Sequence, residues 1–381
     1  MPQIRVVEFG PITQGFSQNN GFLDVRDVSV FIGPQGAGKS TVAKLISSFS
    51  WLEKSCMAQN MQDQLSAEYF ISLLGYHQIS SYLCKDSEIV YNGDCYQFAY
   101  TRGCFSAKKV DDTYVRPKVL YIPADRSFCT SIRNPSRVPG LPANSLEFLA
   151  DFVDAELALS GKTYDLPING YSFRYDDASK KSFIRDVKKN YEIETFSASS
   201  GLLSITPLTL TAAYYSYMLE KSPQNTISLD QMKALKSKLA PAEIVNSRLI
   251  NIVEEPEQNL FPEAQADVLY YLLHCKNAKQ AQSEYKNSLL ITTHSPYIVE
   301  ALNNSIYAER LRSSGKSIRG ILHEEELVSY DEVSAYKFSD GKIESIKNDD
   351  LKQIDAEYLD SCSERIRNVY AQLEDIEFGE K

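Results

Sequence analysis

The chain has 381 residues, of which 43% are hydrophobic and 24% charged, as in a folded globular protein. Its formal net charge of -10 argues against a strongly basic nucleic-acid-binding protein, although a local basic groove stays compatible with it. Seven scattered cysteines without a C-x-x-C pair and an N-terminus without a signal pattern predict a cytoplasmic protein with reduced thiols.

Short, nearly continuous apolar runs predict the strands of the core. Alternation in the first thirty residues adds further strands. Because continuous apolar runs suit strands covered on both faces, and helical patterns lie between them, we expect an α/β fold with a mixed or parallel sheet and helices on both faces. The four runs are 28–32, 119–122, 249–253 and 289–292.

Other segments predict an antiparallel layer and helices beside that sheet. Asn92-Gly93 lies between strand-like flanks and predicts a hairpin over 88–98. A second β-prone stretch covers 170–175. Helices are expected over 53–88, 143–160 and 350–375, a buried loop and helix over 195–218, and an insertion or loose helical excursion over 220–247.

Residues 31–41 give the strongest functional signal. The pattern G-x-x-x-x-G-K-S follows the run 28–32 and precedes helically spaced apolar residues, which favours a nucleoside triphosphate site over a glycine turn beside a surface lysine. Lys39 is expected to reach the β- and γ-phosphates, and the Ser40 hydroxyl to coordinate Mg²⁺. The candidate phosphate-binding residues are Gly33, Pro34, Gln35, Gly36, Ala37, Gly38, Lys39, Ser40 and Thr41.

Two later strands end in polar side chains. The run 249–253 is followed by Glu254 and Glu255, which we interpret as a Mg²⁺ ligand and as the general base for an attacking water. The run 289–292 is followed by His294, which we expect to bond the γ-phosphate or that water. The remaining histidines at 77, 274 and 323 are taken as structural.

A small-residue segment precedes the helix expected within 195–218. Hydroxyl side chains and a glycine at a helix N-terminus are able to bind an anion, although most such sequences are plain helix caps. Ser199, Ser200 and Gly201 become candidates because they accompany the other motifs.

These motifs resemble an ABC-type ATPase. Walker A at 33–40, a serine-glycine signature at 199–201, Walker B at 249–255 and a switch histidine at 294 occur in the order of that class. The resemblance covers most of the chain and implies one ATPase domain over 1–381. Within it, the nucleotide-binding core would be 1–52, 115–130 and 195–345, with an insertion over 53–195.

The sequences of three segments indicate which group of ABC-type ATPases the chain resembles. Glu-Glu-Pro-Glu-Gln-Asn-Leu-Phe-Pro at 254–262 and Thr-Thr-His-Ser-Pro-Tyr at 292–297 are similar to AAA-family ABC ATPases of OLD nucleases and of anti-phage systems such as Septu and PARIS. Tyr-Ile-Pro-Ala-Asp-Arg-Ser at 121–127 is similar to a stretch common in that group. A third hypothesis, the nucleotide-binding subunit of a transporter, is disfavoured because such subunits do not share the sequence of these segments.

The resemblance implies that two copies sandwich ATP and Mg²⁺. Ser199, Ser200 and Gly201 of one copy would contact the γ-phosphate held by Lys39 of the other, and Asn259 would lie near the interface. The chain departs from the family pattern in three ways, which bear on the hydrolysis rate more than on binding. The signature is Ser-Ser-Gly, Glu254 replaces the usual aspartate, and no clear glutamine serves the Mg²⁺-contacting loop, where Asp125 or Arg126 stands.

The preferred hypothesis is a defence-complex ATPase that controls a separate effector, a nuclease or a toxin. It is motivated by the motif set together with the lack of a D-x-D nuclease motif after His294, where the acidic residues of 324–332 read as a solvated face. The alternative is a DNA-repair or recombination ATPase of the SMC-like class acting directly on DNA, although no long heptad run accompanies the motifs.

Overall fold

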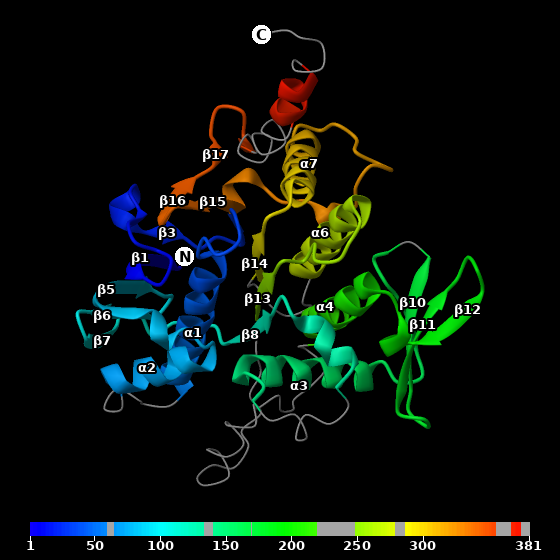
Figure 1. Cartoon of the computed structure of the whole chain (residues 1–381), viewed down its shortest axis with the longest axis horizontal. Coiled ribbons are helices and arrows are strands. Elements are labelled where there is room, and N and C mark those ends of the chain that lie inside the picture. The colour runs from blue at the N-terminus through cyan, green and yellow to red at the C-terminus, as the bar shows by residue number, and fades with distance from the viewer. Residues whose placement is uncertain are drawn as a thin grey trace.

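A seven-stranded mixed sheet forms the centre of the computed structural model, which describes residues 1–58, 65–132, 140–168, 170–218, 248–278, 286–355 and 367–374 (Figure 1). The strand order is β2-β16-β15-β4-β14-β13-β8, in which β2 is Gly15–Phe16 and β16 is Lys342–Ser345. All four apolar runs lie in its parallel part, which confirms the predicted α/β class. These strands are β4 (Val28–Ile32), β8 (Pro117–Ile122), β13 (Arg248–Glu254) and β14 (Ser288–Thr293), with β15 (Val333–Ser339) parallel to β4.

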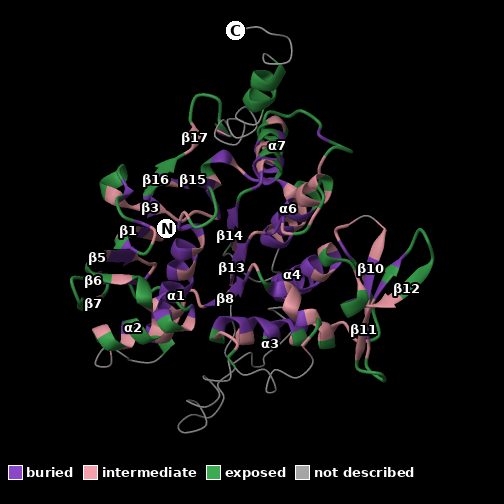
Figure 2. Ribbon diagram, viewed as in Figure 1, coloured by how far each residue is buried: buried purple, intermediate pink, exposed green. Residues whose placement is uncertain are grey.

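Helices cover both faces of this sheet because its strands are apolar on both sides (Figure 2). Alternation along β4 sends Val28, Val30 and Ile32 into one core and Phe31 into the other. The first core contains α3 (Ala143–Ala158), α4 (Ser200–Met218), α6 (Pro262–Asn277) and α7 (Pro296–Ser313). The second contains α1 (Lys39–Ala58) and α2 (Ala67–Tyr76).

Two antiparallel sheets flank the central one, as expected. The hairpin at Asn92-Gly93 forms, with Asn92 opposite Gln97. The stretch 170–175 lies in a four-stranded sheet of order β12-β11-β10-β9. The bounds are β1 (Gln3–Phe9), β3 (Leu23–Asp24), β5 (Leu83–Asn92), β6 (Tyr96–Thr101) and β7 (Cys104–Lys109) in the first sheet, and β9 (Thr163–Asp165), β10 (Tyr171–Asp176), β11 (Lys181–Asp186) and β12 (Tyr191–Glu194) in the second.

The prediction of a helix over 53–88 is wrong in its last part. The chain is helical in the end of α1 and in α2, but from Leu83 it belongs to β5. Strand β5 pairs with β1 from Leu83, opposite Phe9, to Asn92, opposite Gln3. Pairing with a strand distant in sequence therefore outweighs the local helical pattern. The helix over 143–160 and the loop and helix over 195–218 are confirmed by α3, by the 3-10 turn Thr195–Ser197 and by α4.

The C-terminal helix expected over 350–375 is also wrong at its start. Ile354 lies in β18 (Gln353–Ile354), which pairs with β17 (Lys347–Asn348), and its side chain is buried. Residues 367–374 are helical, yet Val369 and Leu373 are exposed. The other apolar positions on which this helix was predicted are Tyr358, Cys362 and Ile366, and they fall outside the described residues. The insertion expected over 220–247 does so as well. None of the described helices is long and apolar enough to cross a membrane.

A buried ion pair joins the central sheet to two helices. Lys118 of β8 donates to both carboxylate oxygens of Asp151 on α3, at 2.7 and 2.9 Å. The Tyr215 hydroxyl of α4 donates to the same carboxylate at 2.5 Å. Both charged side chains are almost fully buried, so each depends on the other for its stabilisation.

We expect Lys118→Met to lower the free energy of unfolding by about 3–5 kcal/mol, because it leaves a buried carboxylate without its cation. The double variant Lys118→Met, Asp151→Leu is expected to regain most of that loss. Urea denaturation measures both. Equal midpoints for the single and double variants would contradict this account of the pair.

Candidate functional site

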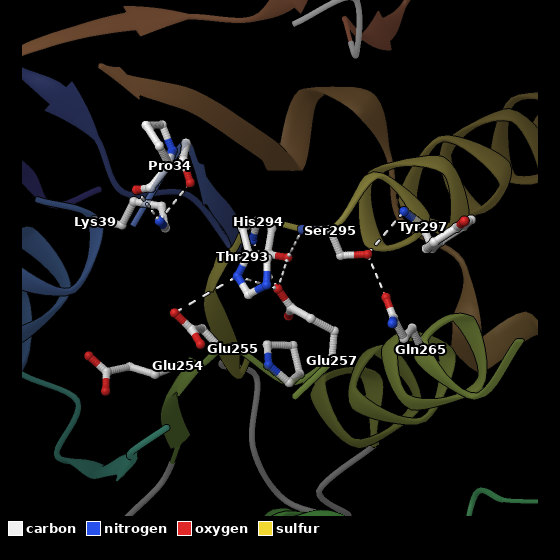
Figure 3. Close-up of polar contacts among 12 residues, drawn as sticks. Pro34, Lys39, Glu254, Glu255, Glu257, Gln265, Thr293, His294, Ser295 and Tyr297 are labelled. Carbon is white, nitrogen blue, oxygen red and sulfur yellow. Dashed lines mark hydrogen bonds and ion pairs between the residues drawn. The ribbon is translucent and has the colours of Figure 1, made fainter. Parts of the chain in front are cut away.

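Three neighbouring strands end at one edge of the central sheet and carry the predicted site there. Ile32 at the end of β4 pairs with Thr293 of β14, and Thr292 pairs with Glu254 at the end of β13. Because these strands are parallel, the segments that follow them emerge side by side. Figure 3 shows Lys39, the acids after β13 and His294 gathered at this edge.

The loop after β4 needs glycine at two positions. Gly33 has a φ of +148° and Gly38 a φ of +102°, and both are in close contact. A Cβ on Gly33 would lie 2.2 Å from the carbonyl oxygen of Phe338, and one on Gly38 would lie 2.3 Å from Cδ1 of Ile12. Helix α1 begins at Lys39, so its free N–H groups face the loop. The loop tip from 34 to 36 is exposed, as an anion site requires.

Lys39 is buried and folds back onto its own loop. Its Nζ donates to the carbonyl oxygens of Gly33 at 2.7 Å and Pro34 at 2.9 Å. Burial lowers the pKa of Lys39, and the negative charges of Glu255, Glu257 and Glu254 oppose that shift. The lysine and the three acids therefore share one electrostatic environment.

Glu254 has one carboxylate oxygen available for a ligand. Its Oε2 accepts a hydrogen bond from the Ala124 amide at 3.2 Å, whereas its Oε1 is buried and has no partner among the described residues. An unpaired buried acceptor suits the water shell of Mg²⁺, which takes one or two carboxylates and keeps several waters. No group of three or more His, Cys, Asp or Glu side chains placed to hold a metal ion occurs in the described ranges.

Glu255 and His294 face each other beside Glu254. Glu255 has a left-handed backbone with a φ of +42°, and its side chain is 23% exposed. Its Oε1 lies 3.9 Å from Nδ1 of His294, whose side chain is 43% exposed. A carboxylate and an imidazole that both reach solvent next to a phosphate-binding loop are able to bind and deprotonate a water.

Glu257, to which the sequence analysis assigned no role, also lies at this edge and contacts His294. It is buried, and its Oε1 accepts from the Thr293 hydroxyl at 2.6 Å and from the His294 amide at 2.9 Å. The same oxygen lies 3.4 Å from Nδ1 of His294. Glu257 thus fixes the position of His294. The sequence offered one signal for Glu257, which is the third acid of the Glu-Glu-Pro-Glu segment. Its contact with His294 depends on the turn that places it.

Arg126 does not stand in for a Mg²⁺-contacting side chain, because it is fully buried and bonded to the protein backbone. Burial lowers its pKa to about 10 against the charges of Glu257, Glu254 and Glu255. Asp125 beside it is exposed and keeps that possibility open. Arg126 donates to the carbonyl oxygens of Ser204 (3.0 Å), Pro123 (3.2 Å), Glu254 (2.8 Å), Glu255 (2.9 Å) and Pro256 (3.4 Å).

The signature segment lies apart from the phosphate-binding loop of the same chain. Ser199 and Ser200 are exposed at the start of α4, and the described contacts include no hydrogen bond from their side chains to that loop. Gly201 approaches the turn after β13, where an added Cβ would lie 2.8 Å from the Asn259 carbonyl oxygen. The structure thus brings together Lys39, Glu254, Glu255 and His294, and places the signature beside Asn259.

Comparisons with known proteins find distant structural neighbours only. No protein-family model matches the chain, and no curated protein matches it. An SMC head domain from Thermotoga maritima aligns with 11% identity and a TM-score of 0.37, over 90% of this chain and 97% of that one. An SMC head domain bound to the C-winged helix domain of ScpA aligns with 10% identity and a TM-score of 0.43, over 92% and 98%. A Pyrococcus furiosus SMC head domain bound to the C-terminal domain of ScpA gives 9% and 0.43, over 96% and 100%.

We expect Arg126→Lys to lower the free energy of unfolding by about 2–5 kcal/mol, because a single ammonium group cannot satisfy the buried carbonyl oxygens. Thermal or urea unfolding measures the loss. Arg102→Lys is the matched control, because Arg102 is exposed in the turn between β6 and β7. Equal losses in the two variants would show that the buried hydrogen bonds of Arg126 are unimportant.

Proposed function

We propose that this chain is a Mg²⁺-dependent ATPase of the ABC type, built as one domain, in which two copies associate around ATP. One observation carries the proposal: Lys39 on a glycine loop at a helix N-terminus shares a sheet edge with Glu254, which has an unpaired buried oxygen, and with the Glu255–His294 pair. The order of these motifs along the chain supports the ABC type.

In the proposed reaction Lys39 exchanges its two loop carbonyls for oxygens of the β- and γ-phosphates. The backbone N–H groups of residues 33–41, except Pro34, bind the phosphates. Ser40 and Glu254 would hold Mg²⁺, which neutralises charge on the phosphates when bound. Glu255 accepts the proton of the attacking water, and His294 donates a hydrogen bond to that water or to the γ-phosphate. Glu257 keeps His294 in place.

Association of two copies would complete the site. Ser199, Ser200 and Gly201 of a second copy would approach the γ-phosphate opposite Lys39. Exposure of the two serines at the N-terminus of α4 supports this arrangement, because those groups are free to meet another molecule. Asn259, exposed and next to Gly201, would lie near the same interface.

The biological role follows from the resemblance alone: ATP-dependent association would control a separate effector in an anti-phage defence complex. The alternative is an SMC-like ATPase that acts directly on DNA. The two differ in their response to DNA. DNA binding that weakens steeply with salt and stimulates ATP hydrolysis would favour the alternative, and hydrolysis unaffected by DNA would favour control of an effector protein.

We expect Glu255→Gln to slow ATP hydrolysis by about 10²–10⁴-fold, because it removes the general base but keeps the shape of the side chain. Light scattering should show a dimer with Mg-ATP, most strongly in this variant, and no such change in Lys39→Ala. Glu324→Gln, at an exposed acid away from the site, is the control and should behave as wild type. A mass that stays constant in every variant and condition would contradict nucleotide-driven association.

We also expect ATP affinity to fall at alkaline pH. Burial lowers the pKa of Lys39 in the free protein, and bound phosphates would raise it. ATP affinity is then highest at pH values below the pKa that Lys39 has in the free protein. It decreases as the pH rises through that pKa, which is lower than the pKa of an ordinary lysine. Titration with a fluorescent ATP analogue from about pH 7 to about pH 10 measures the change. Lys39→Arg, which stays charged, should show no such decrease, and an identical decrease in that variant would assign the effect to another group.

A further inference from the structure

A cavity of about 220 Å³ lies below the sheet edge, between α1, α2, α3 and β8. Aromatic rings of Trp51, Tyr69, Tyr76 and Phe148 line it, together with polar side chains. Its nearest lining residue on α1 is Ser47, about 12 Å along the helix from Lys39 at 1.5 Å per residue. The cavity is therefore separate from the phosphate-binding loop.

Four buried polar side chains from different elements line this cavity without hydrogen-bond partners. Both ring nitrogens of His77, Oγ of Ser48, Oδ1 of Asn144 and the hydroxyl of Tyr121 have no hydrogen-bond partner within the described part of the chain. His77 and Ser48 are 2% exposed, and Asn144 and Tyr121 are 7% exposed. A buried polar group left unpaired costs about 1–3 kcal/mol, so four at one cavity are a costly arrangement for packing alone.

Two acidic side chains that line the cavity have hydrogen-bonded partners. Asp151 is paired with Lys118, and Tyr76 donates its hydroxyl to Glu147. Burial raises the pKa of Glu147, against the nearby charge of Lys118. Burial, followed by the charge of Lys44, lowers the pKa of His77 to about 3, so this ring is neutral at physiological pH. The neutral His77 ring thus suits an uncharged ligand.

We propose that this cavity binds a neutral, planar heteroaromatic molecule of nucleobase size. The aromatic rings offer faces for stacking. Neutral His77 offers one donor and one acceptor, Asn144 an acceptor and Ser48 either, which matches a ring with both kinds of group on its edge. A cavity of about 150 Å³ holds benzene, so the larger volume here admits a bicyclic ring. Ser72 on α2 is exposed and lines the cavity, which therefore reaches the surface.

Tyr121 connects this cavity to the ATP site proposed above. Its ring lines the cavity and lies 4.6 Å from the His77 ring, centroid to centroid. Tyr121 pairs with Ile252 across the parallel strands, so it shares a sheet face with Glu254. Burial raises the pKa of Tyr121 well above its usual value, and the neighbouring Glu254 adds to that shift. An occupant of the cavity would therefore contact the residue that packs beside the proposed Mg²⁺ ligand.

The test uses the fluorescence of Trp51, which is the only tryptophan in the sequence and lines the cavity. Titration of the whole protein with adenine, hypoxanthine, cytosine and uracil, none of which carries a phosphate, should give a saturable change for at least one base. His77→Phe should weaken that binding about tenfold or more and leave thermal stability equal or higher, because it keeps a ring and removes two unpaired nitrogens. Asn144→Ala is the second variant and should also weaken binding.

Lys39→Ala is the control for the other site, because base binding should be unchanged in a variant that no longer binds ATP. Absence of a saturable change up to low-millimolar base would overturn the proposal. Unchanged binding in both His77→Phe and Asn144→Ala would also overturn it, as would loss of base binding in Lys39→Ala. Because no step of this test requires ATP hydrolysis, failure of the ATPase proposal would leave its result intact.

Discussion

The buried guanidinium of Arg126 is the constraint on which the site depends. A charge in the interior is costly unless hydrogen bonds replace its lost water, and here the carbonyl oxygens do so. Those oxygens belong to Pro123 directly after β8, to the end of β13 and the turn that follows it, and to the first turns of α4. One side chain therefore holds three segments in fixed relation, and the left-handed conformation of Glu255 is maintained where a non-glycine residue is normally disfavoured.

The core strands and the polar residues that follow them could be predicted from the sequence, because both depend on short stretches of neighbouring residues. A continuous apolar run has few options other than a strand covered on both faces, and a polar residue directly after it must lie at the sheet edge. This explains why the P-loop, Glu254, Glu255 and His294 were located in advance. The segment from Leu83 was mispredicted because its conformation depends on pairing with β1, which is distant in the sequence. The segment at Ile354 was mispredicted because its backbone bonds to the side chain of Asn303 on α7.

Other site residues could not be predicted from the sequence, because their positions depend on turn geometry and burial. Glu257 binds the His294 backbone only because the chain reverses after Glu255, and no spacing rule gives that reversal. From the sequence alone Arg126 would be expected at the surface near a loop, whereas in the structure it is fully buried beneath the three segments that it contacts. His77 was taken as structural for a similar reason: the sequence shows a lone histidine and cannot show that both its nitrogens are buried without partners.

The contacts of Lys39 with its own loop also have a consequence for ligand selectivity. Its ammonium group already donates to two carbonyl oxygens, so a ligand gains only the difference between the old and the new bonds. A small anion such as inorganic phosphate offers few additional contacts and competes poorly with the loop itself. In the proposed function a triphosphate would occupy the glycine loop and the helix N-terminus at the same time, and these further contacts would favour the exchange. The two loop carbonyls would then compete with any ligand for Lys39 and disfavour short anions.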